Sequence, residues 1–249
     1  CCPVEDLCVR LDAAMAARGL ARSRSQASDW IRRGFVEVNG RLASKPGLAV
    51  AKRDTITLAQ DTPRHLSRGA EKLAAAIAHF GYSPAVRTAL DVGASTGGFT
   101  EILLAAGASR VFAVDVGRDQ LHFALRSDPR VNVLEGLDTR LLERAHVPVP
   151  VEAITADLSF ISLRKALDAA LALAAPDCWL IALVKPQFEA GLEHVGKGGI
   201  VRDPRAREHA CLAVAKWLET SHGWHVDGCI PSPVAGRDGN VEFLLGARR

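Results

Sequence analysis

From residue 81 onward, short apolar runs alternate with stretches in which apolar residues recur at helical spacing. The apolar runs predict seven strands, at 89–92, 111–116, 131–135, 153–157, 179–185, 225–230 and 241–246. Helices are expected between them, for example at 163–174 and 203–220. This alternation is typical of an α/β fold with a mostly parallel sheet and helices on both faces. Prolines and glycines between 231 and 239 predict a loop, and hence a final antiparallel hairpin.

The pattern before residue 60 predicts a small α+β unit instead. Apolar residues from Leu7 to Met15 recur at helical spacing, and Ser23 begins a second helix with Gln26 as its capping partner. An Asn-Gly pair at 39–40 predicts the turn of a hairpin, and 54–58 alternates like a strand. Residues 60–66 are polar and contain a proline, which indicates a linker. We therefore expect a domain at 1–59, a linker at 60–66 and a second domain at 67–249.

The net charge of +3 is unevenly distributed over the 249 residues. Between Arg18 and Arg53 there are nine Lys or Arg residues and two acidic ones, a local charge of +7. From Ser67 onward there are 20 basic and 21 acidic residues, a local charge of −1. The first domain is therefore expected to bind a polyanion such as RNA.

Several classes of protein do not fit the sequence. The longest apolar run, 178–184, is far too short to span a membrane. No cationic start leads into an apolar segment with a cleavage site, so we expect a cytoplasmic protein. None of the six cysteines forms a C-x-x-C pair, so neither a zinc site, nor any other metal site, nor a disulfide framework is expected.

The predicted strand 89–92 leads into a glycine turn and then a helix, an arrangement in which backbone N–H groups converge on a ligand. The turn lacks the G-x-G-x-x-G spacing of dinucleotide sites and the Lys-Ser/Thr ending of a P-loop. Its Asp91 favours a ligand with a cationic end, which S-adenosylmethionine has. Asp115 lies 22 residues beyond Gly93, close to the spacing of a carboxylate that accepts from ribose hydroxyls. Asp138 follows the third strand, where it could accept from the adenine amino group. The predicted cofactor contacts are Asp91, Gly93, Ala94, Ser95, Thr96, Gly97, Gly98, Phe99, Asp115, Val116, Gly136, Asp138 and Asp157.

Polar residues at later strand ends are candidates for the chemistry. Asp157 ends the fourth predicted strand, Lys185 ends the fifth, and Glu242 lies early in the seventh. Lys72 belongs to the helix before the first strand. The chain contains only seven lysines, and lysine can lose its proton when desolvated whereas arginine cannot. A lysine at the end of an apolar strand therefore indicates proton transfer.

These motifs resemble two known families. The segment with Arg22-Ser-Arg24, Ile31-Arg-Arg-Gly34 and Val36-Glu-Val-Asn-Gly40 resembles the S4 RNA-binding domain. Ser67-Arg-Gly-Ala-Glu-Lys72, Ala156-Asp-Leu-Ser159, Val184-Lys-Pro-Gln-Phe-Glu189 and Asn240-Val-Glu-Phe243 resemble the FtsJ-like ribose 2′-O-methyltransferases. Together they look like the TlyA, or haemolysin A, family of ribosomal RNA methyltransferases. That resemblance implies S-adenosylmethionine as cofactor and ribosomal RNA or ribosomal subunits as partner, with a cytidine as the modified nucleoside and no obligatory protein partner. It also implies a catalytic set of Lys72, Asp157, Lys185 and Glu242 on a Rossmann-like domain, and RNA contacts at Arg10, Arg22, Arg24, Arg32, Arg33, Lys45, Arg68, Lys197 and Arg202.

In the mechanism that follows, Lys185 accepts the proton of the ribose hydroxyl. Burial and the neighbouring Lys72 ammonium would favour its neutral form, Asp157 would hold it in place, and Glu242 with Lys72 would orient the hydroxyl. Structural alternatives stay open at this point: Asp157 as a helix N-cap, Lys72 as a surface lysine and Glu242 as an edge-strand charge. The loop at 187–202 is either a mobile lid that contacts RNA or a disordered surface loop.

Three other functions compete with this hypothesis. One is a non-catalytic S4 adaptor that binds S-adenosylmethionine and the ribosome. Another is a pore-forming haemolysin, for which the sequence offers neither an apolar span nor an export signal. The third is a dinucleotide-dependent oxidoreductase, which the glycine spacing disfavours.

Overall fold

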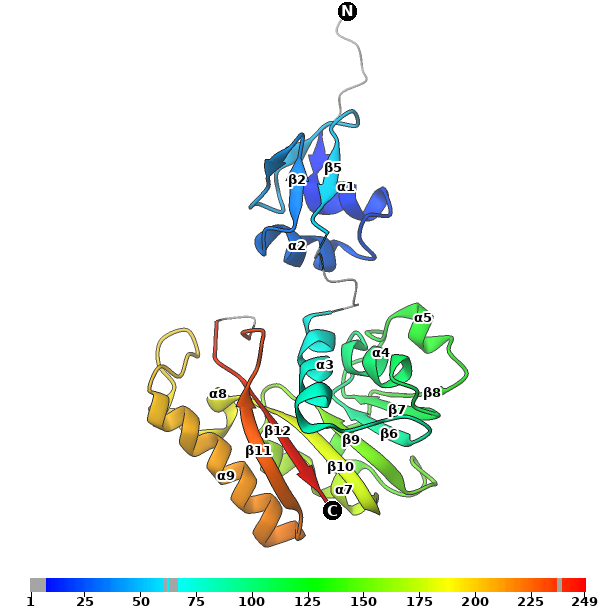
Figure 1. Ribbon diagram of the computed structural model, residues 1–249, viewed down its shortest axis with the longest axis vertical. Helices are drawn as coiled ribbons and strands as arrows, with labels where there is room; N and C mark the ends of the chain where they lie inside the picture. The colour runs from blue at the N-terminus through cyan, green and yellow to red at the C-terminus, as the bar shows by residue number, and fades with distance from the viewer. Residues whose placement is uncertain (1–7, 61, 63–66, 237–238) are drawn as a thin grey trace, which may run out of the picture. The chain divides into compact units, whose positions relative to one another are not determined.

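The computed structural model describes residues 8–60, 62, 67–236 and 239–249. Contacts within the chain define two compact units, Cys1–Leu66 and Ser67–Arg249, and each is described by itself (Figure 1). Of the predicted linker, residues 61 and 63–66 lie outside the described residues, as does Leu7 at the start of the predicted first helix.

The first unit consists of two helices and two small antiparallel sheets around one core. Its sheets have the strand orders β3-β2-β5 and β1-β4. Leu11, Met15 and Ile31 are fully buried between the helices and the strands. In chain order the elements are β1 (Val9–Arg10), α1 (Leu11–Ala17), α2 (Arg24–Arg32), β2 (Val36–Val38), β3 (Arg41–Leu42), β4 (Ala49–Val50) and β5 (Ile56–Leu58).

Local sequence signals fix the boundaries in this unit. Ser23 precedes α2, and its Oγ accepts a hydrogen bond of 3.1 Å from the backbone N–H of Gln26. The Gln26 side chain in turn accepts from the backbone N–H of Arg22, at 2.8 Å. Asn39 and Gly40 both have positive φ, 52° and 73°, as the tight turn between β2 and β3 requires. The predicted cap and the predicted hairpin are both present.

The second unit is built on a seven-stranded sheet with the order β11-β12-β10-β9-β6-β7-β8. The pairs β10·β9, β9·β6, β6·β7 and β7·β8 are parallel, and β12 runs antiparallel to β10 and β11. The mostly parallel sheet and the final hairpin are therefore confirmed. The elements are α3 (Arg68–Phe80), β6 (Thr88–Val92), α4 (Gly98–Ala105), β7 (Arg110–Asp115), α5 (Phe123–Arg126), β8 (Val131–Glu135), η1 (Thr139–Leu141), β9 (Val151–Ala156), α6 (Leu163–Ala166), α7 (Asp168–Ala172), β10 (Ala174–Val184), α8 (Pro186–Glu189), η2 (Leu192–His194), α9 (Pro204–His222), β11 (His225–Pro231) and β12 (Phe243–Arg248).

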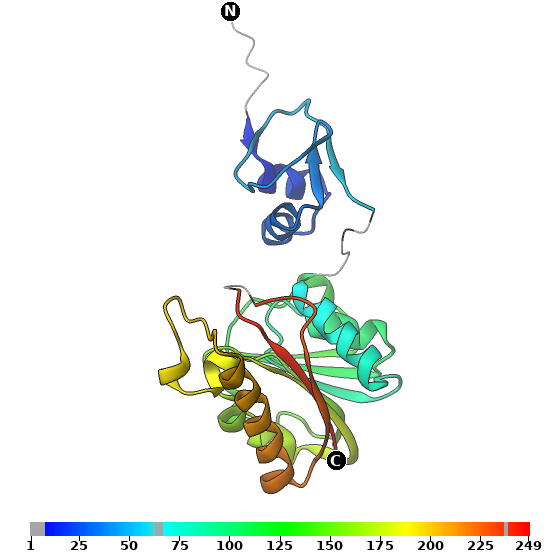
Figure 2. The same ribbon diagram turned by 60° about the vertical axis from the view of Figure 1, so that its left-hand side comes forward.

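Helices cover both faces of this sheet. Leu90 and Ile154 point to the face on which α6, α7 and α9 pack, in one continuous apolar core. Because side chains alternate along a strand, Asp91 and Thr155 point to the other face, where α4 lies. Figure 2 shows α3 and α9 on opposite sides of the sheet. The two-residue period thus determines which polar side chains meet beneath α4.

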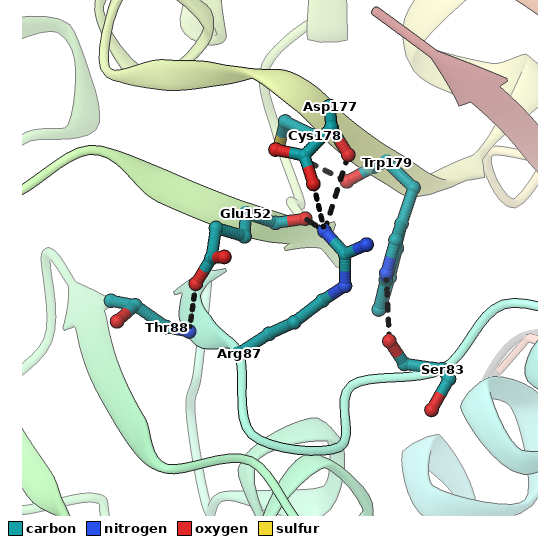
Figure 3. Close-up of polar contacts among 7 residues, drawn as sticks. All are labelled: Ser83, Arg87, Thr88, Glu152, Asp177, Cys178 and Trp179. Atoms are coloured by element: carbon teal, nitrogen blue, oxygen red, sulfur yellow. Dashed lines mark hydrogen bonds and ion pairs between the residues drawn. The ribbon is translucent and has the colours of Figure 1, made fainter.

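A cluster of polar contacts connects neighbouring strands at the edge of the sheet where β6 and β9 begin (Figure 3). The Arg87 guanidinium donates to the backbone oxygens of Glu152 and Asp177, each at 3.2 Å. The Glu152 carboxylate accepts from the backbone N–H of Thr88 at 2.9 Å, and the Trp179 indole donates to Ser83 O at 3.2 Å. These contacts tie three strands together at their amino ends, which leaves the carboxyl edge for the candidate site.

Several predicted boundaries are wrong. The helix expected at 163–174 is two short helices, α6 and α7, and the second ends at Ala172 because Ala174 already pairs with Val151 as part of β10. Tertiary pairing here outweighs the helix propensity of an alanine-rich run. The second strand ends at Asp115 rather than Val116, and Glu242 lies just before β12 rather than within it.

Candidate active site

Two of the predicted catalytic residues meet where neighbouring parallel strands end. Asp157 follows β9 and Lys185 follows β10, and these strands pair through Ala156 and Ala182. The Lys185 Nζ lies 2.6 Å from Asp157 Oδ1 and donates a hydrogen bond of 2.8 Å to Ser159 Oγ. The contact with Asp157 is an ion pair without hydrogen-bond alignment, because its buried Oδ1 accepts no hydrogen bond. The Lys185 amine is therefore held by a carboxylate and a hydroxyl, with only 8% of the residue exposed.

The other two predicted catalytic residues form a second ion pair beside the first. Glu242 directly precedes Phe243, which pairs with Val184, so Glu242 and Lys185 occupy neighbouring positions just beyond the β10·β12 ladder. The Lys72 Nζ, on α3, lies 2.5 Å from Glu242 Oε2. Both side chains are buried, although 170 residues separate them along the chain. The fold thus gathers two ammonium groups and two carboxylates at one edge of the sheet.

The structural alternatives for these residues do not hold. Asp157 is not a helix N-cap, since the residue before α6 is Ser162 and the Asp157 carboxylate is engaged with Lys185. Lys72 is buried rather than a surface lysine, and Glu242 is buried rather than an exposed edge charge. Lys72, Lys185 and Glu242 are buried, and Asp157 is partly exposed. Burying charged groups is costly unless they are paired, and here each has a partner.

The predicted glycine turn joins β6 to α4 at the same edge. Gly93 and Gly97 have φ values of 86° and 97°, which favour glycine. A Cβ on Gly93 would lie 2.5 Å from the Asp157 backbone oxygen, so the turn closes directly against the Asp157 segment. A Cβ on Gly97 would clash with Leu125 of α5. These glycines therefore allow close packing of the turn against its own fold.

The remaining residues of the turn divide between surface and core. Ser95 and Thr96 are exposed, and Ser95 has a φ of 48°. Ala94 and Phe99 are buried, and Gly98 begins α4. Of the predicted cofactor contacts in this turn, Ser95 and Thr96 are thus the ones whose surfaces face outward.

Asp115 connects the glycine turn to the turn that follows β7. Its Oδ2 accepts a hydrogen bond of 2.8 Å from Ser95 N, and its Oδ1 accepts one of 2.7 Å from Gly117 N. The neighbouring Val116 is 72% exposed, an unusual state for valine. Gly136 lies on the adjacent turn, and its N–H donates to the Gly117 oxygen. A half-buried carboxylate beside an exposed apolar surface suits a ligand with both a ribose and a base.

Comparison with known proteins agrees with this arrangement. Residues 65–249 match the FtsJ-like methyltransferase family, and residues 9–56 match the S4 domain. The chain belongs to the FtsJ-like methyltransferase family.

Relatives of this FtsJ-like chain match it along most of its length. It is 47% identical over 240 residues to the 16S/23S rRNA (cytidine-2′-O)-methyltransferase TlyA of Mycobacterium tuberculosis, covering 96% of this chain and 89% of TlyA. It is 38% identical to Hemolysin A of Brachyspira hyodysenteriae, covering 95% of this chain and 98% of the relative. The solved structure "Putative hemolysin from Streptococcus thermophilus" is 37% identical, with a TM-score of 0.77 and coverage of 97% and 88%. The predicted resemblance to the TlyA, or haemolysin A, family is confirmed. Within the described ranges, no helix has the length and apolar character needed to cross a bilayer.

Asp91 lies differently from the prediction. We expected its carboxylate to face the cationic end of the cofactor, but it is fully buried beneath α4. Its oxygens accept hydrogen bonds from Thr100 Oγ1 at 2.6 Å and Thr155 Oγ1 at 3.0 Å. Burial, only partly offset by these hydroxyls, raises the pKa of Asp91 to about 6. In this FtsJ-like domain Asp91 therefore ties β6 to α4 and β9 instead of presenting a surface to a ligand.

Asp138 is also engaged locally. Its carboxylate accepts from the backbone N–H of Arg140 at 3.0 Å and from the Arg140 guanidinium, with contacts of 2.5 to 3.1 Å. The hydrogen bonds from Arg140 lower the pKa of Asp138 to about 2. The carboxylate caps η1. An adenine amino group could therefore donate to this carboxylate only while Arg140 also donates to it.

The predicted RNA-binding arginines of the S4 unit fall into two groups. Arg10 and Arg24 both contact the buried Asp12, at 2.8 and 3.6 Å, while more than half of each side chain stays exposed. Arg33 pairs with Asp29 and lies over the ring of Phe35. The other predicted phosphate contacts in this unit are exposed: Arg22, Arg32 and Lys45.

In the FtsJ-like unit, Arg68 is half-buried at the start of α3, while Lys197 and Arg202 are exposed. Two hydrogen bonds anchor the loop that carries the latter two. Asn240 accepts from Val201 N at 3.1 Å and donates to Gly199 O at 2.9 Å, which ties this loop to the segment before Glu242.

Sequence reasoning missed three residues at this edge. Ser159 accepts from the Lys185 ammonium, and it follows Asp157 within a motif that the resemblance had already marked. Phe160 is 92% exposed with a φ of 66°, and its ring centroid lies 5.6 Å from that of Phe188. Glu189 is a buried carboxylate at the end of α8. An exposed phenylalanine and a buried glutamate both depart from the usual distribution, but only the structure reveals their exposure.

Proposed function

We propose that this protein is an S-adenosylmethionine-dependent methyltransferase that modifies a ribose 2′-hydroxyl of ribosomal RNA, with a cytidine as the target nucleoside. The observation that carries the proposal is the ion pair between the buried Lys185 and the partly exposed Asp157, with the Lys72–Glu242 pair beside it. The M. tuberculosis relative, whose name states this reaction, supports the choice of substrate. The proposal includes action in the cytoplasm, where ribosomal RNA is found, on free RNA or on ribosomal subunits.

The residues at the carboxyl edge fit S-adenosylmethionine. The Asp115 carboxylate uses one lone pair of each oxygen for backbone N–H groups, and its remaining lone pairs can accept from ribose hydroxyls. Val116 offers an exposed apolar surface to the adenine. The turn at 93–98 would adjoin the amino acid end. When bound, this cofactor supplies a methyl group activated by a positively charged sulfur.

The residues of the site have different roles in methyl transfer. A ribose hydroxyl is a poor nucleophile until it loses its proton, and Lys185 accepts that proton in its uncharged form. Asp157 and Ser159 fix the position of the Lys185 nitrogen. The Lys72–Glu242 pair orients the hydroxyl from the other side. Such alignment of reacting groups supplies a large part of the rate in a reaction of this kind.

Two features support RNA as the substrate. The S4 unit presents basic side chains, which bind phosphates without reading sequence. Phe160 and Phe188, which lie just beyond Asp157 and Lys185, offer an aromatic surface on which an unstacked base can lie.

The test uses the full chain with a labelled methyl donor and ribosomal subunits. The wild type should transfer label to RNA at a ribose 2′-oxygen, and Lys185→Ala should lower the rate by about 10²- to 10⁴-fold while still binding S-adenosylmethionine. Lys165→Ala is the matched control, because Lys165 is an exposed lysine of α6 outside the site. Normal turnover by Lys185→Ala would remove Lys185 from the mechanism. No transfer by the wild type would favour the adaptor, and stabilisation by NAD but not by S-adenosylmethionine would favour the oxidoreductase.

A further inference from the structure

Backbone pairing does not by itself fix the distance between Asp157 and Lys185. The last pair between β9 and β10 is Ala156 with Ala182, although Val184 still pairs with Phe243 of β12 and Asp157 N donates to Val92 O, so both functional side chains lie just beyond the β9·β10 ladder. Asp157 begins a connecting segment that ends at α6, and Lys185 begins the short helix α8. Beyond the strands, the position of the segment after Asp157 relative to the helix after Lys185 therefore depends on side-chain contacts, of which the Lys185–Ser159 hydrogen bond is one.

Glu189 supplies another such contact. It is the last residue of α8, and its Oε1 accepts a hydrogen bond of 2.6 Å from Leu163 N while its Oε2 accepts one of 2.7 Å from Ser162 Oγ. The Arg164 guanidinium adds a contact of 3.5 Å to Oε2 and a hydrogen bond of 3.3 Å to Glu189 O. These groups form the start of α6. One carboxylate thus joins the segment after β9 to the segment after β10.

The Glu189 side chain is almost completely withdrawn from solvent, with 1% of it exposed. Burial raises the pKa of Glu189, and the hydrogen bonds from Ser162 and Leu163 oppose that shift. A buried carboxylate is tolerated only where donors surround it, and both of its oxygens have donors here. This position therefore depends on a specific set of hydrogen bonds rather than on apolar packing.

The segment that Glu189 anchors is also strained. At its start, Asp157 N donates to Val92 O at 3.0 Å, and at its end Ser162 and Leu163 donate to Glu189. Between these anchors Phe160 has a φ of 66°, a conformation that is unfavourable for a residue other than glycine. Such a conformation persists only when its surroundings hold it. Release of either anchor would let the segment, and Asp157 with it, move away from Lys185.

We propose that Glu189 is a positioning residue for methyl transfer, whose carboxylate fixes the Asp157 segment against the helix that follows Lys185. This inference rests on the proposed function. Glu189 touches neither reacting group, so its effect should fall on the rate of the chemical step rather than on binding.

Glu189→Gln keeps the volume of the side chain but replaces one acceptor oxygen with an amide that faces donors. We expect the single-turnover rate of methyl transfer to fall by about 10- to 100-fold, since displacements near 1 Å cost about that much. Binding of S-adenosylmethionine and of RNA should stay unchanged. Glu193→Gln is the matched control, because Glu193 is an exposed glutamate four residues further along. An unchanged rate in Glu189→Gln, or a lower rate with binding lost in proportion, would overturn the proposal.

A second pair of variants covers the case in which Glu189→Gln does not fold. Ser162→Ala removes one donor, whereas Ser162→Thr keeps the hydroxyl. We expect the alanine variant to lose several-fold in rate and the threonine variant to recover it, at equal thermal stability. Equal rates in the two would refute the positioning role. Wild-type activity separates the two hypotheses: no transfer by the wild type refutes the proposed function itself, whereas a full rate in the Glu189 variant refutes only the positioning role.

Discussion

The Lys72–Glu242 ion pair allows a quantitative test of how this site is held together. Its nitrogen and oxygen lie 2.5 Å apart, and the two side chains are only 9% and 5% exposed. Removal of one partner from such a pair leaves an uncompensated buried charge, which costs about 3–5 kcal/mol, whereas removal of both charges is often close to neutral. We therefore expect Lys72→Met and Glu242→Gln each to lower the free energy of unfolding by about 3 kcal/mol or more. The double variant should lose much less than the sum of the two.

The assay is urea unfolding followed by tryptophan fluorescence in a Trp30→Phe background. Trp30 is the tryptophan of the S4 unit, whereas Trp179, Trp217 and Trp224 belong to the large unit, so the signal then reports the large unit alone. The four proteins of the cycle share this background, so its own effect cancels. Additive losses in the double variant, or single losses below about 1 kcal/mol, would show that solvent screens the pair and would refute the reasoning.

Two further predictions concern other groups. The pKa of Asp91 is about 6 in the folded protein, above the value of about 4 expected in the unfolded chain. Between about pH 4 and pH 6 the native state therefore holds a proton that the unfolded chain releases, so the free energy of unfolding falls as the pH rises through this window. Asp91→Asn should therefore gain about 3 kcal/mol relative to the wild type between pH 4 and pH 7, and a difference in urea midpoints that does not change with pH would contradict this. In the S4 unit, Arg32→Ala should weaken RNA binding and reduce the slope of log K against log salt by about 0.7 to 0.9, as measured by titration at several salt concentrations; an unchanged slope would exclude a phosphate contact.

The hydrophobic periodicity predicted the strands of the large unit closely, because the local sequence already shows which residues of a strand are buried. The strand at 131–135 was predicted to the residue, and the others within a few residues. The helix at 163–174 was wrong, because pairing between Ala174 and Val151 joins residues 23 positions apart and no local signal reveals it. The hairpin at 35–42 was predictable because its turn requires a positive φ at Asn39 and Gly40, which these two residues tolerate well.

The candidate site was predictable in composition but not in contacts. Lys185 and Asp157 follow apolar strands that end at one edge, so parallel pairing predicts that both lie at that edge but does not predict the contact between their side chains. Asp91 was assigned to the ligand because it precedes a glycine turn. The side on which its carboxyl lies depends on strand alternation combined with the docking of Thr100 from α4. Asp138 likewise could not be predicted from the sequence, because the geometry of η1 brings its carboxylate to Arg140.

The sequence by itself determined the order of the strands and helices along the chain, the glycine turn and the residue types at the strand ends. It also determined the concentration of basic charge before residue 60. The tertiary structure alone decided that Lys72 reaches Glu242 across 170 residues and that Glu189 joins the segments after β9 and β10. The reason is physical: local patterns report which face of an element is buried. The partner that a buried charge finds depends on strand order and register, which are set by packing over the whole domain.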